Sequence, residues 1–113
     1  TIGAQAFFKC GELGEIVLPP NLRNIDGNAF QECWNLQISH IPARVETIAG
    51  WAFYACTGIT SLTFDGTPTT IDAEAFFKCN NLAVINVPWS EGAVANAPWG
   101  VPNATINYDY DGG

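Results

Sequence analysis

The chain has 113 residues, of which 48% are hydrophobic and 13% are charged, and its formal net charge is −7. This length fits one domain. Only four residues are basic, so the chain lacks the positive surface that nucleic-acid binding needs, and anionic membranes would repel it. No apolar run approaches the roughly 18 residues of a membrane-spanning helix, and no signal peptide is visible.

Several residue columns recur along the chain at an interval of 23 residues. A period of this length is typical of solenoids, in which one copy cannot bury its own apolar face and stacked copies cover one another. The columns are Ile2, Ile25, Ile48 and Ile71; Ala6, Ala29, Ala52 and Ala75; Phe7, Phe30, Phe53 and Phe76; Cys10, Cys33, Cys56 and Cys79; Leu13, Leu36, Ile59 and Leu82; and Leu18, Ile41, Phe64 and Val87.

Each copy contains two segments with different spacings. In the A-F-x-x-C segment the three-residue step from Phe to Cys suits a helical turn, although the segment is too short for a stable helix of its own. The L-x-x-I-x-L segment ends with a two-residue step, which is the spacing of a strand with Ile16 and Leu18 on one face. We therefore expect one strand, a turn and a brief helical or 3₁₀ segment in each copy.

The second copy departs from the strand pattern. Ser39 stands where the other copies have Ile16, Leu62 and Ile85, and Ile38 is displaced by one position. Because a shift of one residue sends a side chain to the other face of a strand, we expect either a local bulge or an exposed Ile38.

The repeat columns stop at Pro88, and the composition then changes. We expect residues 89–113 to form a C-terminal cap, with a strand over 104–108, Trp99 covering the last apolar turn and a frayed tail or linker over 109–113. A less favoured alternative is a sugar-stacking platform made of Trp89, Trp99, Tyr108 and Tyr110. At the other end the chain opens inside a copy at Thr1, which we interpret as a fragment or an uncapped end.

The 23-residue pattern A-F-x-x-C-x-x-L-x-x-I-x-L-P resembles the BspA-type leucine-rich repeat of bacterial surface proteins, over residues 1 to about 88. The resemblance implies a leucine-rich-repeat solenoid, rich in β-structure with short helical or 3₁₀ turns. It implies a right-handed curved array of about four copies over 1–88, with a parallel sheet on its concave side. The closing segment also resembles the ends of such arrays in proteins of gut bacteria and their phages. The family implies adhesion or binding at a cell or virion surface.

The four cysteines favour a structural role. Zinc sites need paired cysteines or added histidines, whereas these cysteines are single and the chain has one histidine, His40. Neighbours in a stacked column come within reach of a disulfide, yet a ladder of buried thiols gives the same pattern and is the favoured interpretation. A reactive nucleophile would need a nearby base, which the repeat does not supply. We expect no metal and no cofactor.

The carboxylates Glu12 and Glu15, and Asp72 and Glu74, are interpreted as solvated positions rather than as an acid and base pair, because such chemistry needs a pocket that shifts one pKa. We therefore expect no enzyme activity. Among the aromatic residues, Phe8, Tyr54 and Phe77 form a column that we expect to be partly exposed on the convex side.

Strand phase predicts the binding face. Residues that alternate with the inward columns point outward, and on the concave sheet they form a mildly polar ledge suited to a protein or glycan ligand. The alternative function is a structural spacer or assembly module that associates end to end, and a carbohydrate-active enzyme is a third interpretation. The predicted ligand-binding residues are Glu15, Val17, Ile38, His40, Ser61, Thr63, Val84 and Asn86.

Overall fold

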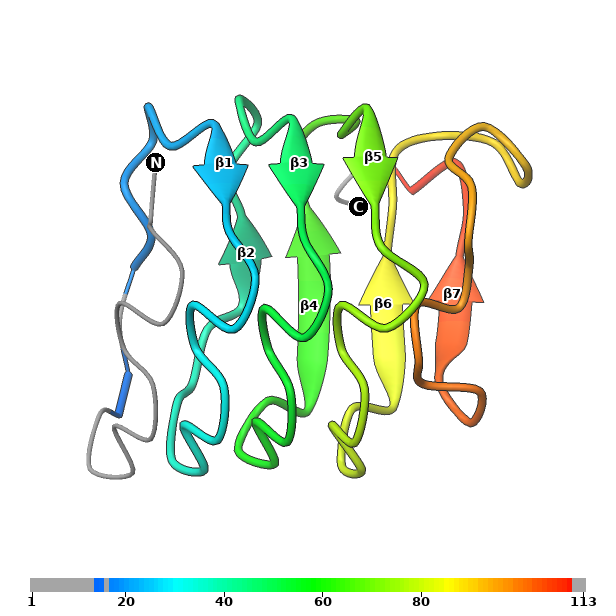
Figure 1. Cartoon of the computed structure of the whole chain (residues 1–113). Coiled ribbons are helices and arrows are strands. Elements are labelled where there is room, and N and C mark those ends of the chain that lie inside the picture. Colours follow the sequence, from blue (N-terminus) through cyan, green and yellow to red (C-terminus); the bar gives the residue numbers. More distant parts are fainter. Residues whose placement is uncertain (1–13, 16, 111–113) are drawn as a thin grey trace.

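The computed structural model describes residues 14, 15 and 17–110, and these residues form a solenoid of two parallel β-sheets without a helix (Figure 1). The successive copies lie side by side, and each adds its strands to the same two sheets. The three-stranded sheet has the order β1-β3-β5, formed by Asn24–Ile25, Thr47–Ile48 and Thr70–Ile71. The four-stranded sheet has the order β2-β4-β6-β7, formed by His40–Ile41, Ser61–Phe64, Val84–Asn86 and Thr105–Asn107.

Strand pairing follows the columns of the repeat. Ile25 pairs with Ile48, which pairs with Ile71, and in the other sheet Ile41 pairs with Phe64. The predicted leucine-rich-repeat solenoid with parallel pairing is therefore confirmed. The expectation of one strand per copy was wrong, because the isoleucine column that opens each copy forms a second sheet of two-residue strands.

The A-F-x-x-C segments are runs of hydrogen-bonded turns rather than helices. In each described copy the residue before the cysteine has a left-handed backbone, with φ of 60° at Glu32, 59° at Ala55 and 65° at Lys78. Such a residue cannot continue a right-handed helix. Backbone donors instead reach the next copy: the Phe30 N–H donates to the Ala52 carbonyl at 2.7 Å.

The core is a stack of identical side chains from successive copies. The rings of Phe30, Phe53 and Phe76 are fully buried and nearly parallel, with neighbouring centroids 5.2 Å apart. Beside them, Cys33, Cys56 and Cys79 are buried reduced thiols, in agreement with the favoured interpretation; Cys10 lies outside the described residues. The Cys56 thiol donates to the Phe30 carbonyl at 3.0 Å, and the Cys79 thiol donates to the Phe53 carbonyl at 2.9 Å.

The segment after Pro88 makes one more coil. The strand expected over 104–108 is β7, which pairs in parallel with β6. Trp99 is fully buried, its carbonyl accepts the Phe76 N–H at 3.0 Å, and its ring packs against Phe64 and Trp89. Because Trp89 and Trp99 are both buried, the sugar-stacking platform is wrong.

The expectation of a frayed tail was wrong for residues 109 and 110. The Asp109 N–H donates to the Trp89 carbonyl at 2.8 Å and the Tyr110 N–H donates to the Val87 carbonyl at 2.9 Å. Residues 109 and 110 are therefore held against the last coil, and residues 111–113 lie outside the described residues.

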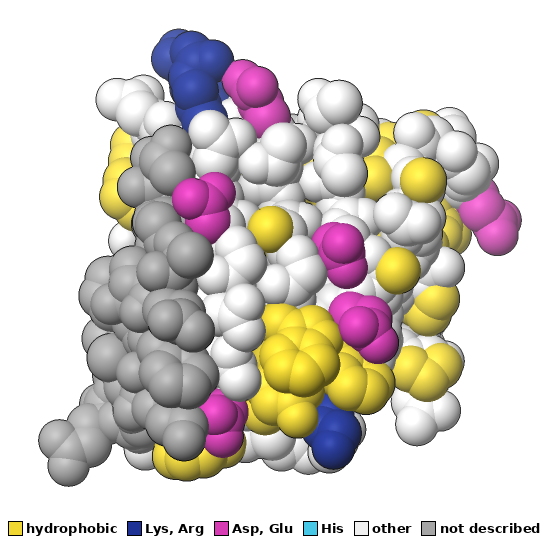
Figure 2. All heavy atoms as spheres, viewed as in Figure 1, with side chains coloured by type: hydrophobic (Ala, Val, Ile, Leu, Met, Phe, Trp, Pro, Cys, Tyr) yellow, Lys and Arg dark blue, Asp and Glu magenta, His cyan; other side chains and the backbone are white. Residues whose placement is uncertain are grey.

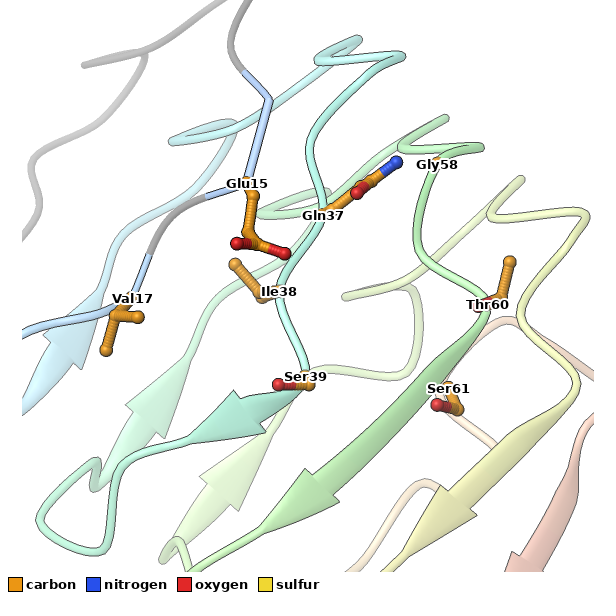
Figure 3. Close-up of a pocket in the computed structure, with 8 residues that line it drawn as sticks. All are labelled: Glu15, Val17, Gln37, Ile38, Ser39, Gly58, Thr60 and Ser61. Atoms are coloured by element: carbon orange, nitrogen blue, oxygen red, sulfur yellow. The ribbon is translucent and has the colours of Figure 1, made fainter.

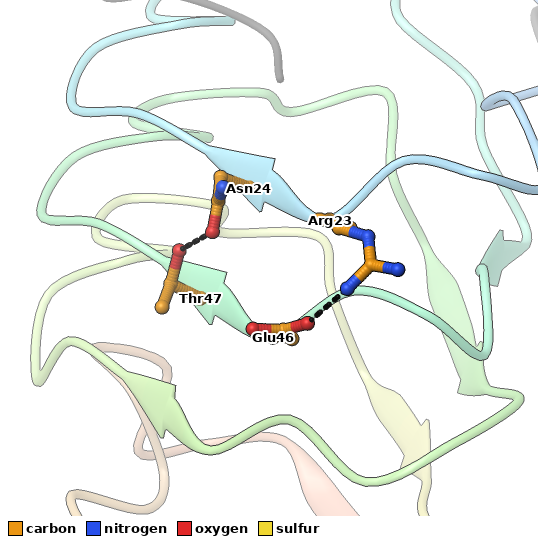
Figure 4. Close-up of polar contacts among 4 residues, drawn as sticks. All are labelled: Arg23, Asn24, Glu46 and Thr47. Atoms are coloured by element: carbon orange, nitrogen blue, oxygen red, sulfur yellow. Dashed lines mark hydrogen bonds and ion pairs between the residues drawn. The ribbon is translucent and has the colours of Figure 1, made fainter.

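Polar side chains on the three-stranded sheet also join neighbouring copies (Figure 4). Arg23 Nη1 lies 2.9 Å from Glu46 Oε2, and the Thr47 hydroxyl donates to Asn24 Oδ1 at 2.7 Å. The ion pair is more than half exposed, so it contributes little to stability. In the link between β4 and β5, glycine is required at position 66 by close approach, since a Cβ there would lie 2.4 Å from the Ala43 carbonyl oxygen.

We expect the free energy of unfolding to fall as the pH rises above about 9, because of Cys56 and Cys79. Burial raises the pKa of Cys79 from 9.0 to about 12, and burial together with the neighbouring thiols raises the pKa of Cys56 as well. The folded state keeps both protons while unfolded thiols ionise. The contribution of the two thiols to the free energy of unfolding is thus fully present below pH 9. Above pH 9, ionisation of each thiol in the unfolded state lowers the free energy of unfolding by about 1.4 kcal/mol per pH unit until the folded pKa is reached.

Urea unfolding of the wild-type chain at pH 8 and pH 10 measures this dependence. The variant carrying Cys56→Ala and Cys79→Ala is the control, because it lacks both titrating groups. The quantity compared is the change in the free energy of unfolding from pH 8 to pH 10, so the variant's stability at pH 8 does not matter. A pH dependence that is the same in both proteins would contradict the assignment.

Candidate ligand-binding face

The outward side chains of the four-stranded sheet form two columns that cross the copies. The strand register aligns Ser61, Val84 and Thr105 in one column and His40, Thr63, Asn86 and Asn107 in the other; we call these seven residues the polar face. Five of the eight predicted ligand-binding residues, His40, Ser61, Thr63, Val84 and Asn86, therefore lie together on one surface.

Hydrogen bonds between side chains tie the second column together. The Asn107 amide donates to Asn86 Oδ1 at 2.8 Å, and the Asn86 amide donates to the Thr63 hydroxyl at 3.2 Å. The three side chains come from β7, β6 and β4, so the chain of bonds spans three strands. A bond of this kind holds each amide in one orientation and reduces the entropy lost when a ligand binds.

His40 is fixed at the other end of this column by an acidic residue. His40 Nδ1 lies 2.8 Å from Asp65 Oδ1, and both side chains remain about half exposed. Asp65 stands where the other copies have proline after the strand. Unlike proline it has a backbone N–H, which donates to the Ile41 carbonyl at 2.9 Å and continues the ladder beyond the end of β4.

The irregular second copy forms a bulge. Ile38 is buried, with 6% of its surface exposed, and Ser39 and His40 are both exposed before the buried Ile41. In the third copy only Thr63 separates the two inward residues of the strand. One residue more on one of two paired strands is the arrangement of a β-bulge. The bulge alternative was therefore right, whereas the expectation that Ile38 faces outward with the binding set was wrong.

The bulge also changes the pairing with the first copy. Glu15 forms an isolated bridge with Gln37 instead of with Ile38, which lies 23 residues further on. Glu15 and Val17 are exposed, as predicted, and 92% of the surface of Val17 is accessible. Both residues flank the bulge beside the polar face.

A groove of about 540 Å³ opens where β2 fails to pair with the beginning of β4. Figure 3 shows Glu15, Ile38 and Ser39 on one side of this space and Thr60 and Ser61 on the other. Gly58 allows the third copy to pack closely against the second copy beside the groove, because a Cβ at this position would lie 2.8 Å from the Leu36 carbonyl oxygen. The groove therefore joins Glu15, Val17 and the tip of Ile38 to the polar face, and its full lining is Glu15, Val17, Gln37, Ile38, Ser39, Gly58, Thr60 and Ser61.

Seven residues of this surface were missed by the sequence analysis: Gln37, Ser39, Gly58, Thr60, Asp65, Thr105 and Asn107. The absence of the proline that follows the strand in the other copies was a signal in the sequence that Asp65 is unusual. The sequence left open whether the second copy forms a bulge or exposes Ile38, so it could not predict that Gln37, Ser39 and Thr60 line this surface. Asn107 pairs with a residue 21 positions earlier, so the 23-residue interval does not align them.

Of the carboxylates considered for catalysis, Glu15 lines the groove beside the polar face, whereas Asp72 and Glu74 lie apart from it. Asp72 and Glu74 are exposed, and the Asp72 carboxylate accepts the Glu74 backbone N–H at 2.9 Å. Glu12 lies outside the described residues. In the described part of the chain, no group of three or more His, Cys, Asp or Glu side chains is arranged to hold a metal ion. The polar face itself offers hydroxyl, amide and imidazole groups, which are suited to hydrogen bonding with a ligand.

The two parallel sheets and the in-phase columns define a leucine-rich-repeat solenoid, and a family comparison gives its type. The family described as BspA type leucine rich repeat region matches residues 1–96 in six copies, so the chain belongs to this family. The curated proteins and the solved structures contain no match to the chain. Repeats of this class generally mediate protein interactions on non-catalytic scaffolds, and members are often surface-associated. None of the described residues belongs to a helix able to span a membrane.

Exchanging the two irregular residues, with Ile38→Ser and Ser39→Ile, should remove the bulge and narrow the groove. The exchange restores the order seen in the third copy, where Ser61 precedes Leu62. We expect β2 to extend and pair with Ser61, which should slow amide hydrogen exchange at residues 60–62. Ser39→Ala keeps the bulge and should leave the exchange rates unchanged. Equal rates in all three proteins would show that the bulge does not limit the pairing.

Proposed function

We propose that the chain is a non-catalytic binding module that recognises a protein or glycan through the polar face and the adjoining groove. The observation that carries this proposal is the hydrogen-bonded column from Thr63 through Asn86 to Asn107, with His40 held by Asp65 at its other end. These groups are exposed or half-exposed, and all except Asp65 stand on strands rather than on loops. A site on regular elements presents its groups in a fixed geometry.

The spacing of the polar face favours an extended ligand. Successive strands of a sheet lie about 4.8 Å apart, so the column from His40 to Asn107 offers a polar group at a regular interval across the copies. A polypeptide strand or a glycan chain that crosses the strands meets several of these groups in turn, and the groove provides room for one larger substituent. Family membership supports a protein ligand, because repeats of this class generally mediate protein interactions.

The cellular setting belongs to the same proposal. We propose that the module works in adhesion at a bacterial cell surface or a virion surface, since members of the family are often surface-associated. Within the chain we assign residues 1–88 to the repeat array and residues 89–113 to its C-terminal cap. Burial of Trp89 and Trp99 over the last coil supports the role of the cap, because the apolar end of a solenoid must be covered for solubility.

Replacing His40 and Thr63 by alanine should weaken ligand binding about tenfold or more while leaving the chain folded. Two hydrogen-bonding groups are lost, and each contributes roughly 0.5 to 1.5 kcal/mol when uncharged. Saturable binding of the labelled domain to bacterial envelopes, animal matrix proteins and a glycan panel provides the measurement, with circular dichroism to check folding.

The matched control carries Glu46→Ala and Thr70→Ala on the three-stranded sheet, and it should bind as the wild type does. Undiminished affinity in the His40 and Thr63 variant would remove the polar face from the proposal. Absence of binding to the whole panel would instead favour a spacer or assembly module.

A further inference from the structure

A second surface lies in the turns that follow the three-stranded sheet. The rings of Trp51 and Tyr54 stack with centroids 4.4 Å apart, and the Phe77 ring of the next copy lies 6.3 Å from Trp51. We call these three residues the aromatic patch. Trp51 is 37% exposed, and Tyr54 and Phe77 are half-buried, as predicted for their column. Figure 2, viewed from the side of the three-stranded sheet, shows a hydrophobic patch on this surface with acidic side chains beside it.

The backbone conformation of Trp51 is unfavourable for so large a residue. Its φ is 60°, in the left-handed region, and the corresponding residue of the preceding copy is Asn28, with φ of 63°. Asparagine tolerates this region well, whereas a bulky residue there is strained. Local folding therefore gives no reason to prefer tryptophan over asparagine at this position. Strain of this kind is concentrated at functional sites.

Charged groups surround the rings. The Trp51 indole N–H donates to Glu74 Oε1 at 3.2 Å, so the carboxylate lies at the edge of the ring. Asp72 is adjacent, because its carboxylate accepts the Glu74 backbone N–H and lies close to Gly50. The Lys78 ammonium is 5.9 Å from the centre of the Phe77 ring. The patch thus already holds one cation of the chain itself over an aromatic face.

We propose that the aromatic patch is a separate binding site for an arginine side chain of a partner protein. A guanidinium group stacks on aromatic faces and also pairs with carboxylates through two parallel hydrogen bonds. Trp51 supplies the ring, and Glu74 and Asp72 supply carboxylates beside it. A lysine ammonium is more strongly hydrated and cannot make the planar contact.

Charge complementarity selects a basic protein over a neutral glycan. The chain has a net charge of −7, and the carboxylates next to Trp51 attract a cation as well as accepting its hydrogen bonds, whereas a neutral sugar gains only the hydrogen bonds. The aromatic patch lies in the turns on the side of the three-stranded sheet, whereas the polar face belongs to the other sheet. Its proposed ligand is therefore independent of the ligand of the polar face.

Titration of the full chain with tetra-arginine amide, followed by NMR at the backbone amides of Tyr54, Glu74 and Phe77, tests this site. We expect a saturable shift, with an apparent affinity about fivefold or more above that for tetra-lysine amide. Trp51→Asn should abolish the response, and Glu74→Gln should weaken it to a similar degree. Asparagine suits the left-handed backbone, so the first variant should remain folded, which circular dichroism checks.

Two control proteins and one control ligand test whether the response is specific to the aromatic patch. Trp34→Ala removes another exposed tryptophan, and the His40 and Thr63 variant alters only the polar face; both should keep the full response. Tetra-citrulline amide, a neutral analogue, should bind weakly. Equal binding of tetra-lysine, an unchanged response in Trp51→Asn, or no saturable shift would overturn the proposal. A saturable shift with cellohexaose but not with tetra-arginine would identify a glycan site instead.

Discussion

Stacking of successive copies in one fixed register is the constraint on which the rest of the structure depends. No copy satisfies its own backbone: the Phe30 N–H needs the Ala52 carbonyl of the next copy, and the Phe30 carbonyl accepts the Cys56 thiol. The phenylalanine rings can stack in parallel only if every copy adds the same length of chain between them. Packing, hydrogen bonding and strand pairing therefore all maintain the 23-residue interval from β1 to β6.

Much of this register could be predicted from the sequence, because a repeated column must stack on itself. The buried phenylalanine and cysteine columns and the strands at Leu62 and Ile85 were predicted in this way, whereas parallel pairing was implied by the family resemblance. The second sheet was not, since its strands are two residues long and show no alternation. The turns were read as helical because their left-handed residues, such as Glu32 and Ala55, are not glycines and give no signal in the sequence.

The candidate sites arise where one copy departs from the others. Asp65 replaces proline and positions His40, the displaced Ile38 opens the groove, and Trp51 takes a place suited to asparagine. Sequence comparison among the copies can locate such departures. It cannot show what each departure contacts, because the partners lie in other copies at intervals such as 21, 22 or 25 residues, and they depend on bulges and loops.

The orientation of the ladders has a mechanical consequence. Hydrogen bonds between copies run along the stacking direction, whereas the strands lie across it. Tension applied between the two ends of the array acts on all interfaces in series, so the weakest interface opens first and the copies separate in sequence rather than together. Each interface depends only on its immediate neighbours, so the loss of one coil leaves the remaining coils paired. A repeat array under tension can thus lengthen stepwise and dissipate energy while part of its binding surface stays intact.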